Sequence, residues 1–259
     1  MKLALLCDYG LDDMVATLYL LKHADKFEQI DILPVGGNFP LADAFNNAKR
    51  ILTYVERLPS NVNLVDTSSV AQFEEKLAEI HGADGIGNFL PKEHKYNGKV
   101  LDYDAWLDAV DESYVIMSLG PCTVTADILK NKSVNSLILM CGNIAEPPNH
   151  GEYEFNHGMD PAAFSECVKE PHFVATLDTC HCEQCDFNRI KIENDGLFER
   201  AIKKAVELSN SRGEKGCYIY DLVAVKYLLH PEFFTSYSAT DPFGNHLNVL
   251  KYISTEQII

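Results

Sequence analysis

Short apolar runs alternate with amphipathic segments along most of the chain, and this alternation restricts the fold more than any other feature. Apolar runs of strand length occur at residues 2–7, 30–37, 61–66, 113–120, 134–142 and 172–178. Segments with helical periodicity lie between and after them, at residues 12–24, 41–58, 101–112, 122–131, 160–169, 196–210 and 219–234. Because strands that alternate with helices of about ten residues form right-handed crossovers, the pattern predicts an α/β fold with a mostly parallel sheet flanked by helices.

The pattern runs on without a break, which favours a single domain over residues 1–259 with a Rossmann-like core. No linker, repeat or low-complexity tract interrupts it, and a chain of 259 residues can bury a sizeable core. In open parallel sheets, ligands bind outside the carboxyl ends of the strands. The loops after the strands at 2–7, 30–37, 113–120 and 134–142 are therefore the places to search for a site.

The acidic composition restricts the partners. The formal net charge is −16 at pH 7, so the chain repels nucleic acid and anionic membrane surfaces. No apolar run reaches the roughly 18 residues of a membrane span, and the first apolar run ends at Asp8, too early for a signal peptide. In the absence of a secretion signal, the eight cysteines are expected to be reduced thiols in a cytoplasmic protein.

Three aspartates follow the first predicted strand at close spacing. Asp8 ends the strand, and Asp12 and Asp13 open the next helix. Helix capping explains one or two such acids, because an aspartate at a helix N-terminus accepts backbone hydrogen bonds. Three exceed that explanation, since carboxylates repel one another and no Lys or Arg lies between Lys2 and Lys22. A hard divalent cation such as Ca²⁺ or Mg²⁺ is the predicted counter-charge.

Further motifs follow in a fixed order, and together with the acidic loop they resemble one family. They are "CDYGLDD" at 7–13, "GGN" at 36–38, "HGADGIGNF" at 81–89, "SLGPCTVTA" at 118–126, "LMCGN" at 139–143, "EFNHGMDPAAF" at 154–164 and "YDLVAVKYLLHP" at 220–231. In this order they are similar to the signature segments of the inosine–uridine preferring nucleoside hydrolases, across roughly residues 3 to 235. The resemblance implies the nucleoside hydrolase fold and a calcium-dependent N-ribohydrolase that releases ribose and free base from a ribonucleoside.

The resemblance also implies roles for the acids. Asp8 would bind calcium and act as general base on a calcium-bound water. Asp13 and the distant Asp221 would be further carboxylate ligands, and the main-chain carbonyl of Leu119 would complete the protein ligands. Tyr220 stands where the family has a histidine that protonates the leaving base, and its hydroxyl can donate a hydrogen bond there.

The other matched positions imply a pocket for a small-molecule ribonucleoside. Carboxylate and amide groups suit the vicinal hydroxyls of ribose, and a histidine would line the base pocket. The residues implied to bind the ribose are Asp12, Asn38, Glu154 and Asn156, and the one implied to line the base pocket is His81. Met140 and Asn149 lie in loops that can reach the ribose or its 5′-hydroxyl. By the same resemblance, the chain would form a homo-oligomer, a dimer or a tetramer.

The chain departs from the family pattern at identifiable positions. Leu6 replaces a leading acid, and Tyr9 replaces a proline, which puts a phenol next to the metal loop where it can alter the pocket wall. The stretch at 206–216 is shortened where a mobile helix normally covers the base. Little of the family's C-terminal hairpin and final helix is expected in "DPFGNHLNVLKYISTEQII" at 241–259.

Alternatives remain open. The changes at Leu6 and Tyr220 also suit a non-hydrolytic, calcium-bearing nucleoside- or ribose-binding protein, or a hydrolase of a different N-riboside. A phosphotransfer enzyme would use Asp8 as its nucleophile, but the candidate loops carry no lysine. The segment "CHCEQC" at 180–185 can be interpreted as a metal or redox site, or more simply as a loop of free thiols.

Overall fold

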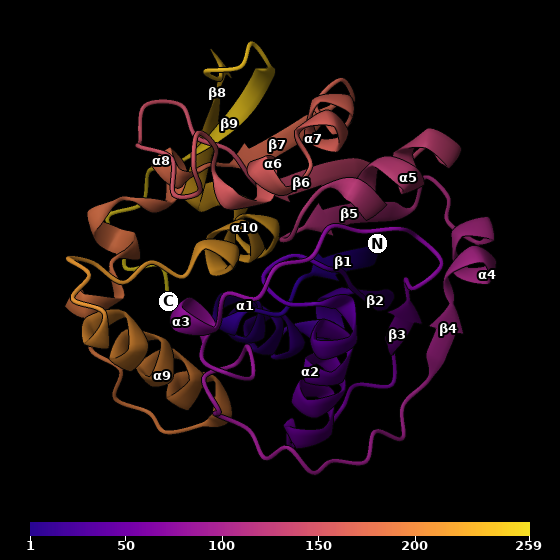
Figure 1. Ribbon diagram of the computed structural model, residues 1–259, viewed down its shortest axis with the longest axis horizontal. Helices are drawn as coiled ribbons and strands as arrows, with labels where there is room; N and C mark the ends of the chain where they lie inside the picture. The colour runs from indigo at the N-terminus through magenta and orange to yellow at the C-terminus, as the bar shows by residue number, and fades with distance from the viewer.

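The computed structural model describes residues 1–259 and contains one nine-stranded sheet (Figure 1). The strands are β1 (Lys2–Cys7), β2 (Gln29–Pro34), β3 (Val62–Asp66), β4 (Val100–Asp102), β5 (Tyr114–Ser118), β6 (Ser136–Met140), β7 (His172–Ala175), β8 (Phe234–Thr240) and β9 (His246–Tyr252). Their spatial order is β4-β3-β2-β1-β5-β6-β7-β9-β8. Neighbouring strands are parallel except β8 and β9, which form an antiparallel hairpin at one edge.

Helices connect most of the strands. They are α1 (Leu11–Leu21), α2 (Leu41–Tyr54), α3 (Ala78–His81), α4 (Tyr103–Asp108), α5 (Thr123–Asn131), α6 (Phe155–Met159), α7 (Pro161–Cys167), α8 (Leu177–Cys180), α9 (Leu197–Ser211) and α10 (Tyr220–Leu229). Short 3-10 turns are η1 (Ala24–Lys26), η2 (Glu183–Cys185), η3 (Phe187–Arg189) and η4 (Pro231–Phe233). None of these helices combines the length and the apolar character that crossing a membrane requires.

Two apolar cores lie on the two faces of the sheet. Successive side chains of a strand point to opposite faces, so β1 contributes Leu3 and Leu5 to one core and Ala4 and Leu6 to the other. The first core also contains side chains of α1, α2, α9 and α10, and the second contains side chains of α4, α5 and α7. Figure 1 shows these two sets of helices on opposite sides of the strands.

The strand order places a switch point beside β1. From β1 the chain builds outward to β2 on one side and to β5 on the other. Loops leave in opposite directions at such a point, which opens a crevice at the carboxyl ends of the strands. Asp8 follows β1 there and Leu119 follows β5, so both predicted ligands lie at the crevice.

The α/β fold with a mostly parallel sheet is confirmed, while two local predictions are wrong. Residues 101–112 are not one helix, because Val100–Asp102 pairs with β3 and only α4 is helical. The tail does contain a hairpin, and Val249 of β9 pairs with Val174 of β7. No helix follows the hairpin. In β8 only one residue is buried, so its sequence carries little of the apolar alternation that marks a strand.

Candidate active site

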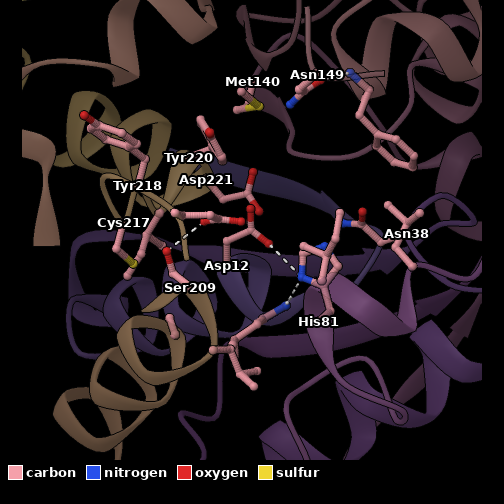
Figure 2. A pocket seen from close by; sticks show the side chains of 18 of the residues that line it. Asp12, Asn38, His81, Met140, Asn149, Ser209, Cys217, Tyr218, Tyr220 and Asp221 are labelled. Atoms are coloured by element: carbon pink, nitrogen blue, oxygen red, sulfur yellow. Dashed lines mark hydrogen bonds and ion pairs between the residues drawn. The ribbon is translucent and has the colours of Figure 1, made fainter. Parts of the chain in front are cut away.

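A cavity of about 500 Å³ opens at the switch point of the sheet (Figure 2). This volume falls within the ~300–1,000 Å³ range of small-molecule sites. Most of the predicted site residues line it: Asp12, Asn38, His81, Leu119, Met140, Asn149, Glu154, Asn156, Tyr220 and Asp221. The other two, Asp8 and Asp13, are buried and do not line the cavity.

Asp8 follows the last residue of β1 and is 1% exposed. Its two carboxylate oxygens accept hydrogen bonds from the backbone N–H and the side-chain amide of Asn38, each at 2.8 Å. Burial raises the pKa of Asp8 to about 7, and the hydrogen bond from the backbone N–H of Asn38 acts in the opposite direction. The loop after β2 approaches closely, because a Cβ atom at Gly37 would overlap Asp8 Oδ2. Asp8 is therefore a buried carboxyl group that exchanges its proton near neutral pH.

Three carboxylates meet where α1 packs against α10. Oxygen atoms of Asp12, Asp13 and Asp221 lie within 4.8 Å of one another, and the Oδ1 atoms of Asp12 and Asp13 are buried without a hydrogen-bond partner. Burial and then neighbouring carboxylates raise the pKa of Asp13 and of Asp221. Such a cluster needs protons or a cation to balance it, and hard divalent cations prefer oxygen donors. Asp12, predicted to bind ribose, belongs to this cluster, whereas Asp8 lies outside it.

Leu119 follows β5 and lines the cavity. The side-chain amide of Asn156 donates to Leu119 O at 2.8 Å and to Met140 O at 2.9 Å. These two bonds fix the Asn156 side chain against the ends of β5 and β6. Because a carbonyl oxygen has two lone pairs, Leu119 O can accept a further ligand.

Glu154 precedes α6 and caps its N-terminus. Its carboxylate accepts hydrogen bonds from the N–H groups of Asn156 and His157, each at 3.1 Å, and from Gly142 N–H at 2.8 Å. Burial raises the pKa of Glu154, and these three N–H groups act in the opposite direction. The side chain thus ties α6 to the loop after β6 and presents a buried carboxyl group to the cavity.

The His81 imidazole packs against the start of α1. Its Nδ1 accepts the backbone N–H of Leu11 at 3.1 Å, so that nitrogen carries no proton. Nδ1 also lies 3.8 Å from Asp12 Oδ1, which is too far for a hydrogen bond. Burial lowers the pKa of His81, which favours the neutral ring. Neutral His81 then carries its proton on Nε2 and can donate one hydrogen bond to a ligand.

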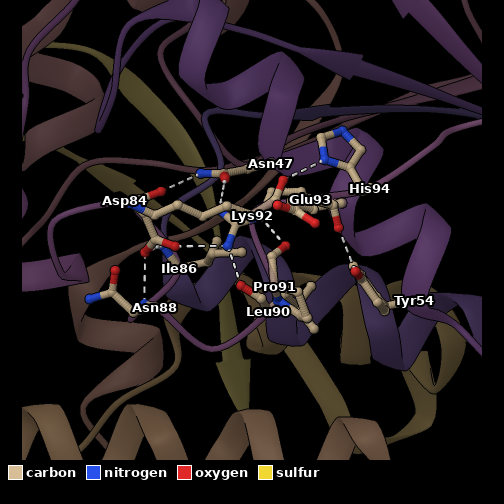
Figure 3. Close-up of polar contacts among 11 residues, drawn as sticks. Asn47, Tyr54, Asp84, Ile86, Asn88, Leu90, Pro91, Lys92, Glu93 and His94 are labelled. Atoms are coloured by element: carbon tan, nitrogen blue, oxygen red, sulfur yellow. Dashed lines mark hydrogen bonds and ion pairs between the residues drawn. The ribbon is translucent and has the colours of Figure 1, made fainter.

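The segment after His81 is anchored by a buried arginine on α2. Arg50 pairs with Asp84 at 2.9 Å, and its Nη2 also donates to the carbonyl of Leu90. The Asn47 side-chain amide donates to Asp84 O at 2.8 Å, and Asn47 Oδ1 accepts from Arg50 at 2.9 Å. Figure 3 shows Asn47, Asp84 and Leu90 among these contacts. A long segment with little regular structure is thereby held against α2 beside the cavity.

One wall of the cavity was not identified residue by residue from the sequence. It comes from the end of α9 and the segment before α10: Ala205, Leu208, Ser209, Arg212, Glu214, Gly216, Cys217, Tyr218 and Ile219. Ser209 Oγ donates to Glu214 at 2.7 Å, and Arg212 donates to the carbonyl of Ile80 at 2.7 Å. The sequence did mark 206–216 as the region that covers the base. The polar residues of this stretch, which precede Tyr220, were the sequence feature that could have identified the wall.

The two tyrosines that distinguish this chain occupy different environments. Tyr220 begins α10 and lines the cavity, and burial raises its pKa. Tyr9, by contrast, does not line the cavity and so does not alter its wall directly. Tyr9 is fully buried in the core, its hydroxyl lies 3.5 Å from Thr17 Oγ1, and its φ is +46°. The tight turn from β1 into α1 directs its side chain into the core, away from the cavity.

The thiol-rich segment does not gather into one metal site. Cys180 Sγ faces the carbonyl of Tyr220 at 3.9 Å, and both ring nitrogens of His181 have other partners. Cys182 and Cys185 do contact each other, with their sulfur atoms 3.0 Å apart. The Cys185 thiol lowers the pKa of Cys182 to about 7. The side chains whose potential metal-ligand atoms do come together are those of the acidic cluster.

Comparison with known proteins gives concordant matches. The sequence model described as "Inosine-uridine preferring nucleoside hydrolase" matches residues 3–246. The chain is 26% identical to a pyrimidine-specific ribonucleoside hydrolase of Shewanella woodyi, over 90% of this chain and 80% of that protein. It is 23% identical to a non-specific ribonucleoside hydrolase of Escherichia coli, over 88% and 79%. The fold resembles a purine-preferring ribonucleoside hydrolase from Gardnerella vaginalis, with a TM-score of 0.74 at 22% identity over 99% and 94% of the two chains.

Proposed function

This chain belongs to the inosine-uridine preferring nucleoside hydrolase family, and we propose that it hydrolyses the N-glycosidic bond of ribonucleosides with a calcium ion held at its acidic cluster. The observation that carries the proposal is the pair of buried, unpartnered oxygens on Asp12 and Asp13 beside Asp221. Asp12 and Asp221 line a cavity of about 500 Å³, and Asp13 lies buried beside them. The names of the relatives from Shewanella woodyi and Escherichia coli, both ribonucleoside hydrolases, support the reaction and substrate class.

The donor set fits calcium because every candidate ligand is an oxygen. We assign Asp8, Asp13, Asp221 and the carbonyl of Leu119 as its ligands. Asp8 lies outside the closest group of carboxylates, but its charge is near enough to raise the pKa of both Asp13 and Asp221. When bound, calcium would neutralise the cluster, orient the ribose hydroxyls and lower the pKa of a water.

The protein groups then divide the work of cleavage. Asp8 is ionised when it binds calcium, so its carboxylate can take a proton from a water. Carboxylates below the ribose stabilise the positive charge that develops on the sugar as the bond breaks. Asp12, Asn38, Glu154 and Asn156 are assigned to the ribose hydroxyls, and Met140 and Asn149 to the sugar edge of the cavity. Neutral His81 offers its Nε2–H to the base, and Tyr220 is assigned to the leaving group.

The direct test is release of reducing sugar from inosine, uridine, cytidine and their 2′-deoxy forms, with calcium present. We expect turnover of ribonucleosides and strong discrimination against 2′-deoxy substrates, which leave a buried polar partner unmatched. Asp8→Asn should abolish turnover, whereas Asp25→Asn, at an exposed position, should not. Thermal stabilisation by nucleosides without any turnover would instead support a non-hydrolytic binding protein.

A homo-oligomer remains part of the proposal by family resemblance. Sedimentation velocity of the calcium-loaded protein tests it, since a dimer or tetramer of this 29.0 kDa chain is well separated from the monomer. A single monomeric species at assay concentration contradicts it.

A further inference from the structure

A carboxylate and an imidazole lie behind Tyr220. Glu146 Oε2 is 2.9 Å from His181 Nδ1, and His181 Nε2 is 3.1 Å from the Tyr220 hydroxyl. The three residues come from separate parts of the chain: the loop after β6, the residue after α8 and the first residue of α10. Tyr220 lines the cavity, while Glu146 and His181 do not. Together they form a hydrogen-bonded row that leads from the protein surface to the cavity.

The row is held from both sides. The Asp178 carboxylate accepts the backbone N–H groups of Ile144 and Ala145 at 2.7 Å and of Glu146 at 3.1 Å. These bonds fix the loop that carries the Glu146 side chain. On the other side, the rings of His181 and Tyr218 lie 4.5 Å apart, centroid to centroid. The two ring planes are tilted by 36°, and the imidazole is therefore confined by this ring contact as well as by its two hydrogen bonds.

The hydrogen-bond capacities of the three groups determine how the row can work. A carboxylate only accepts, so His181 Nδ1 carries a proton and donates it to Glu146. In the neutral ring, Nε2 accepts, and the Tyr220 O–H points at His181 and away from the cavity. In the protonated ring, Nε2–H donates to the tyrosine oxygen, and the Tyr220 O–H is free to point into the cavity. The state of His181 thus sets whether Tyr220 can donate to a ligand.

We propose that Glu146 and His181 are positioning residues that deliver a proton through the Tyr220 hydroxyl to the leaving base, an inference that rests on the proposed function. As the bond between the sugar carbon and the base nitrogen breaks, its electron pair passes to the base. The base takes the proton of the Tyr220 O–H, and the tyrosine oxygen takes the Nε2 proton of His181 in the same step. His181 ends neutral, still donating Nδ1–H to Glu146, and regains a proton from water.

The surroundings of His181 suit this exchange. Its side chain is 24% exposed, so solvent can reprotonate it, and that of Glu146 is 38% exposed. Tyr220 remains a neutral hydroxyl throughout, because it loses and gains a proton together. General acids of this kind typically contribute about 10²–10⁴-fold to the rate. The row gives this chain a proton source for the leaving base although no histidine occupies position 220.

The test compares substrates that differ in their need for a proton. The bases of inosine and uridine are poor leaving groups that need a proton as they depart. The p-nitrophenolate released from p-nitrophenyl β-D-ribofuranoside is a stable anion and needs none. For His181→Gln, which keeps a hydrogen-bonding side chain, we expect kcat on nucleosides to fall about 100-fold with KM within threefold. Turnover of the p-nitrophenyl riboside should stay within threefold of wild type. Glu146→Gln should show the same selectivity with a smaller loss.

A matched control is available at the other end of α10. His230 and Glu232 form a similar pair, 3.1 Å apart, away from the cavity, so His230→Gln should leave both activities unchanged. Equal losses of His181→Gln on both substrate types, or no loss on nucleosides, would overturn the relay while the hydrolase function stands. A wild-type protein that cleaves neither substrate would overturn the proposed function and the relay together. Circular dichroism and calcium binding confirm that each variant is folded.

Discussion

Calcium binding should become tighter as the pH rises, because the cation competes with protons on buried carboxyl groups. Burial raises the pKa of Asp8 to about 7, and burial with neighbouring charge raises the pKa of Asp13 and Asp221. A carboxyl group whose folded pKa lies above its unfolded value stabilises the metal-free fold at low pH, and that contribution is lost as the pH rises through 7. A carboxylate that binds calcium is already deprotonated, so the calcium-bound fold does not lose stability as the pH rises. Calcium binding is therefore favoured at higher pH.

The magnitude follows from Asp8 alone. Between pH 6 and pH 8 a group with a pKa of about 7 passes from mostly protonated to mostly ionised, so calcium affinity should rise about tenfold, or about 1.4 kcal/mol. At pH 7 about half a proton should leave Asp8 for each calcium bound. The titrations of Asp13 and Asp221 can only add to both numbers, because the pKa values of these groups are also raised.

Isothermal titration calorimetry measures both quantities. Chelator-stripped protein is titrated with calcium at pH 6, 7 and 8, and at pH 7 in two buffers of different ionisation enthalpy to count released protons. Asp8→Asn should bind more weakly with a shallower pH dependence, whereas Asp25→Asn should match wild type. A calcium affinity that is equal within twofold at pH 6 and pH 8 would refute the reasoning.

Three further predictions concern the supports of the site. Gly37→Ala places a methyl group against the Asp8 carboxylate and should lower kcat about 100-fold, and an unchanged kcat contradicts that close approach. Arg50→Met leaves a buried carboxylate unpaired and should cost about 3–5 kcal/mol, or about 6–15 °C in melting temperature, while exposed Arg57→Met should shift it by less than about 2 °C. Glu154→Gln presents an amide donor to backbone N–H groups, so we expect about 1–2 kcal/mol less stability and a raised KM. Unchanged stability and unchanged KM would argue against the assigned role of Glu154 in holding the loop and binding ribose.

The parts of the site that are local in sequence could be predicted from it. Asp8 and Asp13 sit at a junction between an apolar strand and an apolar helix, and that pattern alone demands a counter-charge. Asp221 could be added only through the order of family motifs, because as a single residue it is an ordinary acid in the first turn of a helix. The strand–helix alternation directed the search to the carboxyl ends of the strands, whereas the strand order and its switch point beside β1 came from the structure.

The contacts between loops could not be predicted in the same way. Glu146, His181 and Tyr220 are far apart in sequence, and no periodicity relates them. Their approach depends on the conformations of irregular segments, which apolar patterning does not determine. The same limit explains β4, which is too short to show alternation, and β8, an edge strand with exposed side chains on both faces.

The packing of α1 against α10 has a consequence for folding kinetics. Asp13 lies near the start of the chain and Asp221 near its end, so their cluster exists only after both helices have docked. A nascent chain on the ribosome therefore lacks this acidic cluster until α10 has emerged. Contacts that form late change the unfolding rate more than the folding rate. Bound calcium should accordingly slow the opening of the finished molecule and leave its rate of folding almost unchanged.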